Sequence, residues 1–300
     1  MEIIKSCEIC GNTSFSEYLK SKDYFYTHEN YTIIKCDNCE FLFVTPRPDK
    51  NEIIKYYKTK EYISHSNIKK GITNKLYHFA RKLNHKTKYK LINKYVQSGA
   101  ILDIGCATGE FLNYFKKLKW TVLGIEPDDA SRSHAIKQYK IDVFSETKLD
   151  VIEKGTFDVI TMWHVIEHVH NINERVQQLY NLLKYNGIAV IAVPNINCYD
   201  ACKYQKYWAG FDLPRHLYHF SKKSLIGLFQ KHNFKIIDIY PLKFDAYYIS
   251  LLSEKYKNGK KNIFNALING LKSNMWAKKN RNEYSSLIFV FKKTSEIEDI

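Results

Sequence analysis

Two pairs of cysteines near the beginning of the chain have the spacing of metal ligands. Cys7 and Cys10 form the first pair, and Cys36 and Cys39 form the second. A Cys-x-x-Cys pair places two thiolates on one tight turn, and two such pairs complete a tetrahedral zinc site. A thioredoxin-like redox pair is disfavoured because no βαβ pattern surrounds either motif. The spacing therefore predicts a structural zinc ion in a small ribbon-like domain.

The turn between Asp103 and Gly109 has the pattern of a site for a nucleotide-like ligand. In the stretch ILDIGCATGEFL, an apolar strand enters a turn whose glycines, Gly105 and Gly109, are four residues apart, and a helix follows. Glycine lacks a Cβ atom, so the backbone and a ligand can approach closely. Glu126 ends the next strand, where its carboxylate suits the hydroxyls of a ribose. Because the turn is not GxGxxG, the pattern argues against a dinucleotide.

The segment WHVIEH, at the end of a later strand, brings three ionisable side chains close together in sequence. His164, Glu167 and His168 are near enough to share one site. Two interpretations stay open: they are ligands of a divalent metal, or they are histidines packed at the start of a helix. No metal is assigned to them on the sequence alone.

A loop rich in aromatic and polar residues, YWAGFDLPRHLYHFS, covers 207–221 and ends on a residue that suits a helix N-cap. Histidine titrates near neutrality, so His216 or His219 can take the proton from a hydroxyl or an acidic carbon during a transfer reaction. Arg215 suits an anionic group such as a phosphate. The alternative is a packed lid whose histidines bond to the backbone.

The elements that must position these residues alternate from residue 100 onward. Near-continuous apolar strands separated by helices predict a parallel sheet covered on both faces, which is an α/β fold. Two late strands, at 234–240 and 286–291, predict a hairpin-like edge. We expect a zinc-ribbon-like domain over 1–48, a helical connecting segment over 49–98 and a Rossmann-like domain over 99–300. The other predicted strands are 100–104, 121–125, 141–144, 157–162 and 188–193, and the predicted helices are 52–57, 75–96, 110–118, one from 130, 173–183 and 223–232.

Length and composition suit one large domain with a smaller attachment. The chain has 300 residues, of which 45% are apolar and 26% charged, as in ordinary globular proteins. No apolar run reaches the roughly 20 residues that span a bilayer, and the N-terminus lacks the apolar core of a signal peptide. We therefore expect a cytoplasmic protein in which Cys106, Cys198 and Cys202 are free thiols. No pattern predicts an oligomeric state.

The positive charge lies at the two ends of the chain. The net charge is +15, of which +8 falls in 1–98, −2 in 99–195 and +9 in 196–300. Such an excess attracts nucleic acid, anionic lipid or phosphorylated substrates. A Lys/Asn-rich composition that produces only a solvated basic surface is the simpler interpretation.

Four segments together resemble the class I (Rossmann-like) S-adenosylmethionine-dependent methyltransferases. LDIGCATGEFL resembles their first motif, GIEPD their acidic second motif, FDVITMWHVIEHV their strand-four segment and LLKYNGIAVIAVPN their strand-five segment. The resemblance implies that Asp103 faces the methionine amino group and that Glu126 holds the ribose diol. It also implies that Gly105, Cys106 and Gly109 line the methionine and ribose, and that Met162 and Trp163 leave strand four beside the cofactor.

The segments after strands four and five resemble small-molecule methyltransferases. Glu167 and His168 resemble the EH pair of enzymes that include those of ubiquinone biosynthesis, some of which use the pair to bind a divalent metal. PRHLYHF with the cysteine pairs resembles bacterial methyltransferases, some of which methylate carbon on nucleotide-linked keto-sugars, with the zinc domain over the substrate. We therefore expect the acceptor to be a small molecule that contacts His164, Glu167, His168, Trp208, Arg215 and Tyr218.

Three functions follow from these resemblances. The preferred one is methyl transfer to a nucleotide-sugar or another glycan precursor, and the alternative is O-methylation of a quinol or phenol. A zinc-ribbon protein that binds or modifies nucleic acid is a further alternative, supported by the basic ends. The polar-Pro-Pro-aromatic tetrapeptide of nucleic-acid amino-methyltransferases is missing after strand four, so nucleic acid is not the expected partner.

Overall fold

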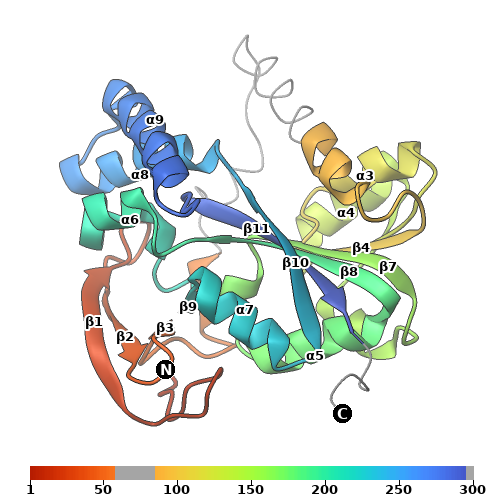
Figure 1. Ribbon diagram of the computed structural model, residues 1–300, viewed down its shortest axis with the longest axis horizontal. Helices are drawn as coiled ribbons and strands as arrows, with labels where there is room; N and C mark the ends of the chain where they lie inside the picture. Colours follow the sequence, from red (N-terminus) through yellow and green to blue (C-terminus); the bar gives the residue numbers. More distant parts are fainter. Residues whose placement is uncertain (58–84, 295–300) are drawn as a thin grey trace.

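The computed structural model describes residues 1–57 and 85–294. Within these ranges, 53–56 forms a 3-10 helix, η1 (Ile53–Tyr56), and 85–92 is α-helical. The part of the predicted helix 75–96 that precedes residue 85 lies outside the described residues. The strands form two sheets, a large one in the second part of the chain and a small one that starts near the N-terminus (Figure 1).

The large sheet has seven strands in the order β10-β11-β8-β7-β4-β5-β6. β4, β5, β6, β7 and β8 run parallel, and β11 runs antiparallel to both of its neighbours, β8 and β10. The predicted Rossmann-like fold is thereby confirmed, with β11 inserted between β8 and β10. The strands are β4 (Ala100–Ile104), β5 (Thr121–Ile125), β6 (Asp142–Phe144), β7 (Phe157–Trp163), β8 (Leu183–Pro194), β10 (Phe234–Pro241) and β11 (Ser286–Lys293).

Successive residues of the central strands face opposite sides of the sheet, as pleating requires. Ile101 and Val159 join a core with α3 (Glu110–Lys117), α4 (Asp129–Tyr139) and the helix at 85–92. Leu102 and Ile160 join the core on the other side, with α5 (Ile172–Leu182) and α7 (Lys222–Gln230). Both faces are therefore covered, which explains why these strands are apolar throughout.

Two helices between β10 and β11 correspond to no predicted element. They are α8 (Asp245–Asn258) and α9 (Ile263–Lys279), which pack on each other beside α6 (Tyr199–Tyr204) (Figure 1). Their buried positions are mostly small or polar, as with Ser253 and Ser273, so the apolar pattern of a core-facing helix is absent. Among the residues that the structure describes, no helix combines the length and apolar character needed to cross a bilayer.

The small sheet joins the N-terminal segment to the loop after β8. β1 (Phe15–Lys22), β2 (Asn30–Cys36) and β3 (Leu42–Val44) are antiparallel neighbours, and β3 also pairs with the two-residue β9 (Tyr218–His219). The loop predicted to contact the substrate therefore supplies one strand of the ribbon sheet.

A buried ion cluster reinforces this junction. Asp23, which is 0% exposed, accepts backbone N–H bonds from Phe25, Tyr26 and Thr27 at 2.9–3.1 Å. Its Oδ1 also lies 3.4 Å from the guanidinium of Arg215. The carboxylate of Asp23 thus accepts hydrogen bonds from a turn of the ribbon and also pairs with the guanidinium of Arg215 in the loop.

We predict that Asp23→Ala lowers the free energy of unfolding by about 3–5 kcal/mol, since it leaves buried donors and a buried guanidinium without their acceptor. Urea denaturation followed by circular dichroism measures the change. Asp142→Ala removes an exposed aspartate from β6 and is the control, with an expected change below about 0.5 kcal/mol. Equal stability of the two variants would contradict the role given to Asp23.

Candidate functional site

A large cleft lies at the carboxyl ends of β4, β5, β7 and β8. Its volume of ≈ 2780 Å³ exceeds the roughly 300–1,000 Å³ of a pocket for one drug-sized ligand, so a cofactor and an acceptor fit together. Seven of the predicted site residues line it: Gly105, Glu126, Trp163, His164, His168, Arg215 and His216. The structure therefore brings the glycine turn and the histidine segments to one place.

The glycine turn needs glycine at both of its marked positions. Gly105 and Gly109 have φ values of +77°, a region that residues with a Cβ rarely adopt. A Cβ on Gly105 would lie 2.5 Å from Cγ2 of Val165, and one on Gly109 would lie 2.7 Å from Cδ1 of Ile141. Gly109 is also the N-cap of α3. The turn therefore packs on Val165, which follows β7, and on Ile141, which belongs to the core beneath α3 and α4.

Two carboxylates, Glu126 and Asp103, lie at this turn, Glu126 at the cleft wall and Asp103 behind it. Glu126 accepts the N–H groups of Ala107 (2.8 Å) and Asp128 (2.9 Å), which fix its orientation at the cleft wall. Burial raises its pKa, and these hydrogen bonds partly offset that shift. Asp103 is buried behind the wall, where Oγ1 of Thr161 donates to it at 2.5 Å. Burial raises the pKa of Asp103 to about 7, against the lowering effect of that bond.

Two histidines on the opposite side of Val165 are held by backbone carbonyls. Nδ1 of His168 lies 2.9 Å from the carbonyl oxygen of Arg215 and 2.9 Å from the hydroxyl of Tyr57, and Nδ1 of His216 lies 2.9 Å from the carbonyl oxygen of Gly210. A carbonyl only accepts, so both Nδ1 atoms carry the proton and both Nε2 atoms keep a lone pair in the neutral state. Burial and the neighbouring His216 lower the pKa of His168 to about 4, so this imidazole is neutral at pH 7.

His164 carries the positive charge of the site. Its φ is 56°, which turns the ring between two acids: Nε2 lies 3.0 Å from Asp245 and Nδ1 lies 3.4 Å from Glu167. Although burial opposes the charge, the two acids raise the pKa of His164 to about 10. His164 is therefore a fixed cation, unsuited to accept a proton near pH 7.

Glu167 is the most secluded acid of the site. It is 0% exposed, and within the described part of the chain its oxygens have no hydrogen-bond partner that meets the geometric limits. Burial raises its pKa, but the contact with His164 and the charges of His216 and His168 together outweigh burial, so the pKa is lowered. One ligand atom each from Glu167, His168 and His216 lies within 4.8 Å of the others. Carbonyl-oriented imidazoles beside a carboxylate are a donor set that fits a divalent metal.

The other predicted residues lie in the protein interior. Trp208 and His219 pack edge-on against Phe211, with ring centroids 5.0 and 5.1 Å away. Tyr218 donates its hydroxyl to the carbonyl of His170 at 2.8 Å. Cys106 and Met162 are buried beside the turn. Cofactor or substrate contact by these five stays a prediction.

Arg215 reaches the cleft but already has acidic partners. Its guanidinium lies 2.6 Å from Asp212 and 3.4 Å from Asp23, and it covers the ring of Phe25 at 4.8 Å. These contacts give the cation a structural function. Its predicted function, the binding of an anionic acceptor, stays a prediction.

Sequence reasoning missed several residues that line the cleft. Asp245, Tyr248 and Tyr256 come from α8, while Tyr57 follows η1 and Phe25 belongs to the ribbon. Aromatic residues are frequent throughout the chain, so no spacing marked the four aromatic ones, and no motif surrounds Asp245. Only the packing of distant segments brings them to the site.

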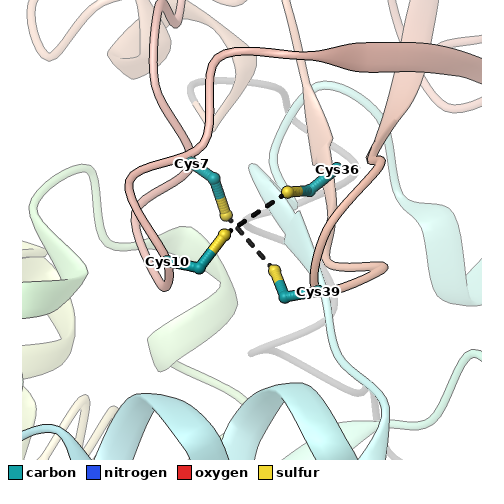
Figure 2. A group of neighbouring side chains, drawn as sticks. All are labelled: Cys7, Cys10, Cys36 and Cys39. Atoms are coloured by element: carbon teal, nitrogen blue, oxygen red, sulfur yellow. Dashed lines mark hydrogen bonds between the residues drawn. The ribbon is translucent and has the colours of Figure 1, made fainter.

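The four cysteines of the ribbon point toward one centre (Figure 2). Sγ of Cys7 lies 3.5 Å from that of Cys39, and Sγ of Cys10 lies 3.5 Å from that of Cys36. Tetrahedral zinc with bonds of about 2.3 Å requires sulfurs about 3.8 Å apart. The cluster is therefore compatible with a zinc ribbon, as the spacing predicted.

We expect metal analysis to find about one zinc per chain. Cys36→Ser removes one ligand and should abolish stoichiometric zinc and lower the melting temperature, because the two cysteine turns would lose the ion that joins them. Cys202→Ser changes an exposed cysteine outside the cluster and should keep the zinc. A wild-type protein purified without chelator that contains no zinc would refute the assignment.

Comparison with known proteins gives matches in the same part of the chain. The family described as "Methyltransferase domain" matches residues 76–239. A ubiquinone biosynthesis O-methyltransferase of Rhodopseudomonas palustris is 34% identical over 102 residues, which are 32% of this chain and 40% of that protein. One from Pelagibacter ubique is 32% identical over 113 residues, 36% of this chain and 47% of the relative. The match thus spans less than half the length of these relatives.

Solved structures similar to the chain share little of its sequence. A SAM-dependent methyltransferase from Archaeoglobus fulgidus is 18% identical with a TM-score of 0.49, covering 71% of this chain and 94% of its own. A possible histamine N-methyltransferase from Thermotoga maritima is 19% identical with a TM-score of 0.45, covering 72% of this chain and 98% of its own.

Proposed function

The chain belongs to the class I S-adenosylmethionine-dependent methyltransferases, and we propose that it methylates a hydroxyl group of a small aromatic acceptor, a quinol or a phenol. The observation that carries the proposal is the pair of histidines, His168 and His216, whose Nδ1 atoms face backbone carbonyls at the cleft wall. In the neutral form of each ring the lone pair is on Nε2, because the carbonyl accepts the Nδ1 proton. Such a nitrogen accepts the proton that a hydroxyl must lose.

Apolar and aromatic side chains on the acceptor side of the cleft suit the binding of an aromatic ring. Phe25, Tyr57, Tyr248, Ile249 and Leu252 line it, and aromatic faces prefer to pack on such surfaces. The O-methyltransferases of ubiquinone biosynthesis are relatives over the core, which supports the same class of acceptor.

A nucleotide-sugar or glycan precursor, which the sequence led us to prefer, has weaker support. That preference needs a cation for the phosphates, and Arg215 suits the purpose by type. In the folded chain, however, Asp212 and Asp23 already occupy its guanidinium.

The reaction needs alignment and the removal of one proton. When bound, S-adenosylmethionine would supply an electrophilic methyl group on its sulfonium sulfur. Glu126 would hold the ribose, and the Gly105 turn would let the methionine part approach the backbone. His216 takes the hydroxyl proton on Nε2, while the carbonyl of Gly210 keeps the ring oriented. Glu167 and Asp212 then stabilise the imidazolium that forms.

A divalent metal at Glu167, His168 and His216 is the second candidate for hydroxyl activation. The buried carboxylate without hydrogen bonds favours it, and a cation there would lower the pKa of a bound hydroxyl. The two mechanisms share these residues but differ in their response to chelators.

For the cofactor, we expect Glu126→Gln to weaken S-adenosylmethionine binding by roughly tenfold to a hundredfold, since a charged acceptor of hydrogen bonds is lost. Gly105→Ala should abolish binding, because its Cβ would meet Val165 and its φ is strained. Glu153→Gln, an exposed glutamate, is the matched control. Calorimetry measures the dissociation constants, and unchanged values in both site variants would refute the cofactor assignment.

For the base, we expect His216→Gln to lower kcat for a catechol probe by about 10²–10⁴-fold while cofactor binding is kept. His219→Gln, at a buried histidine outside the cleft wall, should retain most of kcat. Transfer of a labelled methyl group measures both rates. Loss of wild-type activity in EDTA and its recovery with Mg²⁺ would assign activation to the metal instead. Methylation of UDP-glucose but of no catechol would overturn the aromatic acceptor.

A further inference from the structure

Helix α9 of the α8–α9 hairpin buries small and polar side chains and exposes large apolar ones, the reverse of an ordinary amphipathic helix. The residues that α9 buries are small or polar: Ala266, Asn269, Gly270, Ser273 and Ala277. The opposite face presents Phe264, Leu267, Leu271 and Met275, whose exposed fractions are 72%, 54%, 54% and 56%. At 100° per residue these four side chains fall within a narrow arc. We call them the α9 stripe.

The interior of the hairpin explains why large side chains are excluded from it. A Cβ on Gly270 would lie 2.4 Å from Cδ1 of Tyr247 on α8, so the two helices touch closely. Asn269 donates to the hydroxyl of Tyr204 at 2.8 Å, and that hydroxyl donates to Glu254 at 3.0 Å. Polar bonds and close contact hold the hairpin, and the α9 stripe contributes nothing to that packing.

A row of basic residues frames the α9 stripe. Residues 255–282 contain eight lysines and arginines and no acidic residue. Lys260 and Lys261 precede the helix, Lys272 flanks the stripe, and Lys278 and Lys279 end the helix, all of them exposed. An apolar stripe with basic residues around it is the pattern of a helix that lies in the surface of an anionic bilayer.

We propose that the α9 stripe and its lysines dock on an anionic lipid surface. A second copy of the chain fits this face poorly, since a two-fold contact would bring the basic residues of both copies together. Nucleic acid would pair its phosphates with the lysines, but it would leave the four exposed apolar side chains without a partner. The hairpin lies beyond residues 76–239, which match the methyltransferase family, so family membership does not carry the inference.

α8 connects this surface to the cleft. Asp245, Ile249 and Tyr256 line the cleft from α8, while Phe244 and Tyr248 are exposed on it (86% and 53%). In Figure 1 the two helices lie together at one end of the molecule, away from α3 and α4. Docking through the outer face of α9 would therefore hold the lipid one helix away from the α8 wall of the cleft.

The test is flotation of the full chain with vesicles. We expect binding to vesicles of phosphatidylcholine mixed with phosphatidylglycerol, weakening with salt, and at least about tenfold weaker binding to pure phosphatidylcholine. Leu267→Gln with Leu271→Gln should weaken binding by roughly tenfold or more, as should Lys260→Glu with Lys261→Glu. The control is Leu118→Gln, at an exposed leucine that ends α3 and should leave binding unchanged.

Three results would overturn the proposal. The first is no binding of the wild type to anionic vesicles, or binding that the leucine pair does not affect. The second is a concentration-dependent dimer in light scattering that the leucine pair abolishes, which assigns the stripe to a second copy. The third is RNA binding without vesicle binding. The same variants should bind S-adenosylmethionine like the wild type, so failure here is separable from failure of the proposed methyl transfer.

Discussion

The backbone of Leu217 connects the three segments on which the cleft depends. Its N–H donates to the carbonyl of Glu167 at 2.8 Å, and its carbonyl accepts the N–H of Val44 in β3 at 3.0 Å. Buried backbone groups must find such partners, so the ribbon, the loop and the end of β7 are fixed together. The carbonyl of Arg215, two residues earlier, is then in place to orient His168. The histidine pair therefore depends on a sheet that begins at the N-terminus.

This dependence gives the ribbon a function beyond its own stability. Its strands bury Ile33, Phe43 and Val44 in the core, and a further constraint can join the two cysteine turns. The cluster around Cys36 can supply that constraint through a metal, and β2, which ends at Cys36, pairs with β3. The ribbon holds the loop at the cleft in place because its strand β3 pairs with β9 of that loop. The cysteines and the histidine pair are thus parts of one structure.

Local pattern predicted the cofactor half of the site and little of the acceptor half. The Gly105 turn and Glu126 belong to consecutive strand–helix units, where spacing alone fixes which residues meet. The state of His164 depends instead on Asp245, which the fold brings from a helix far along the chain. The loop sequence likewise did not separate His216 at the cleft wall from His219 in β9, because that difference arises only when β9 pairs with β3.

The α8–α9 hairpin was missed for a related physical reason. Sequence patterns locate helices by assuming that large apolar residues face the core, and here Leu267 and Leu271 face outward. Exposed apolar patches of this kind mark an interaction surface or else promote aggregation. The lysines beside the α9 stripe oppose aggregation, because their like charges repel one another. Departures from local rules concentrate where a protein works. The region least readable from pattern is therefore the hairpin between β10 and β11, whose helix α8 lines the cleft.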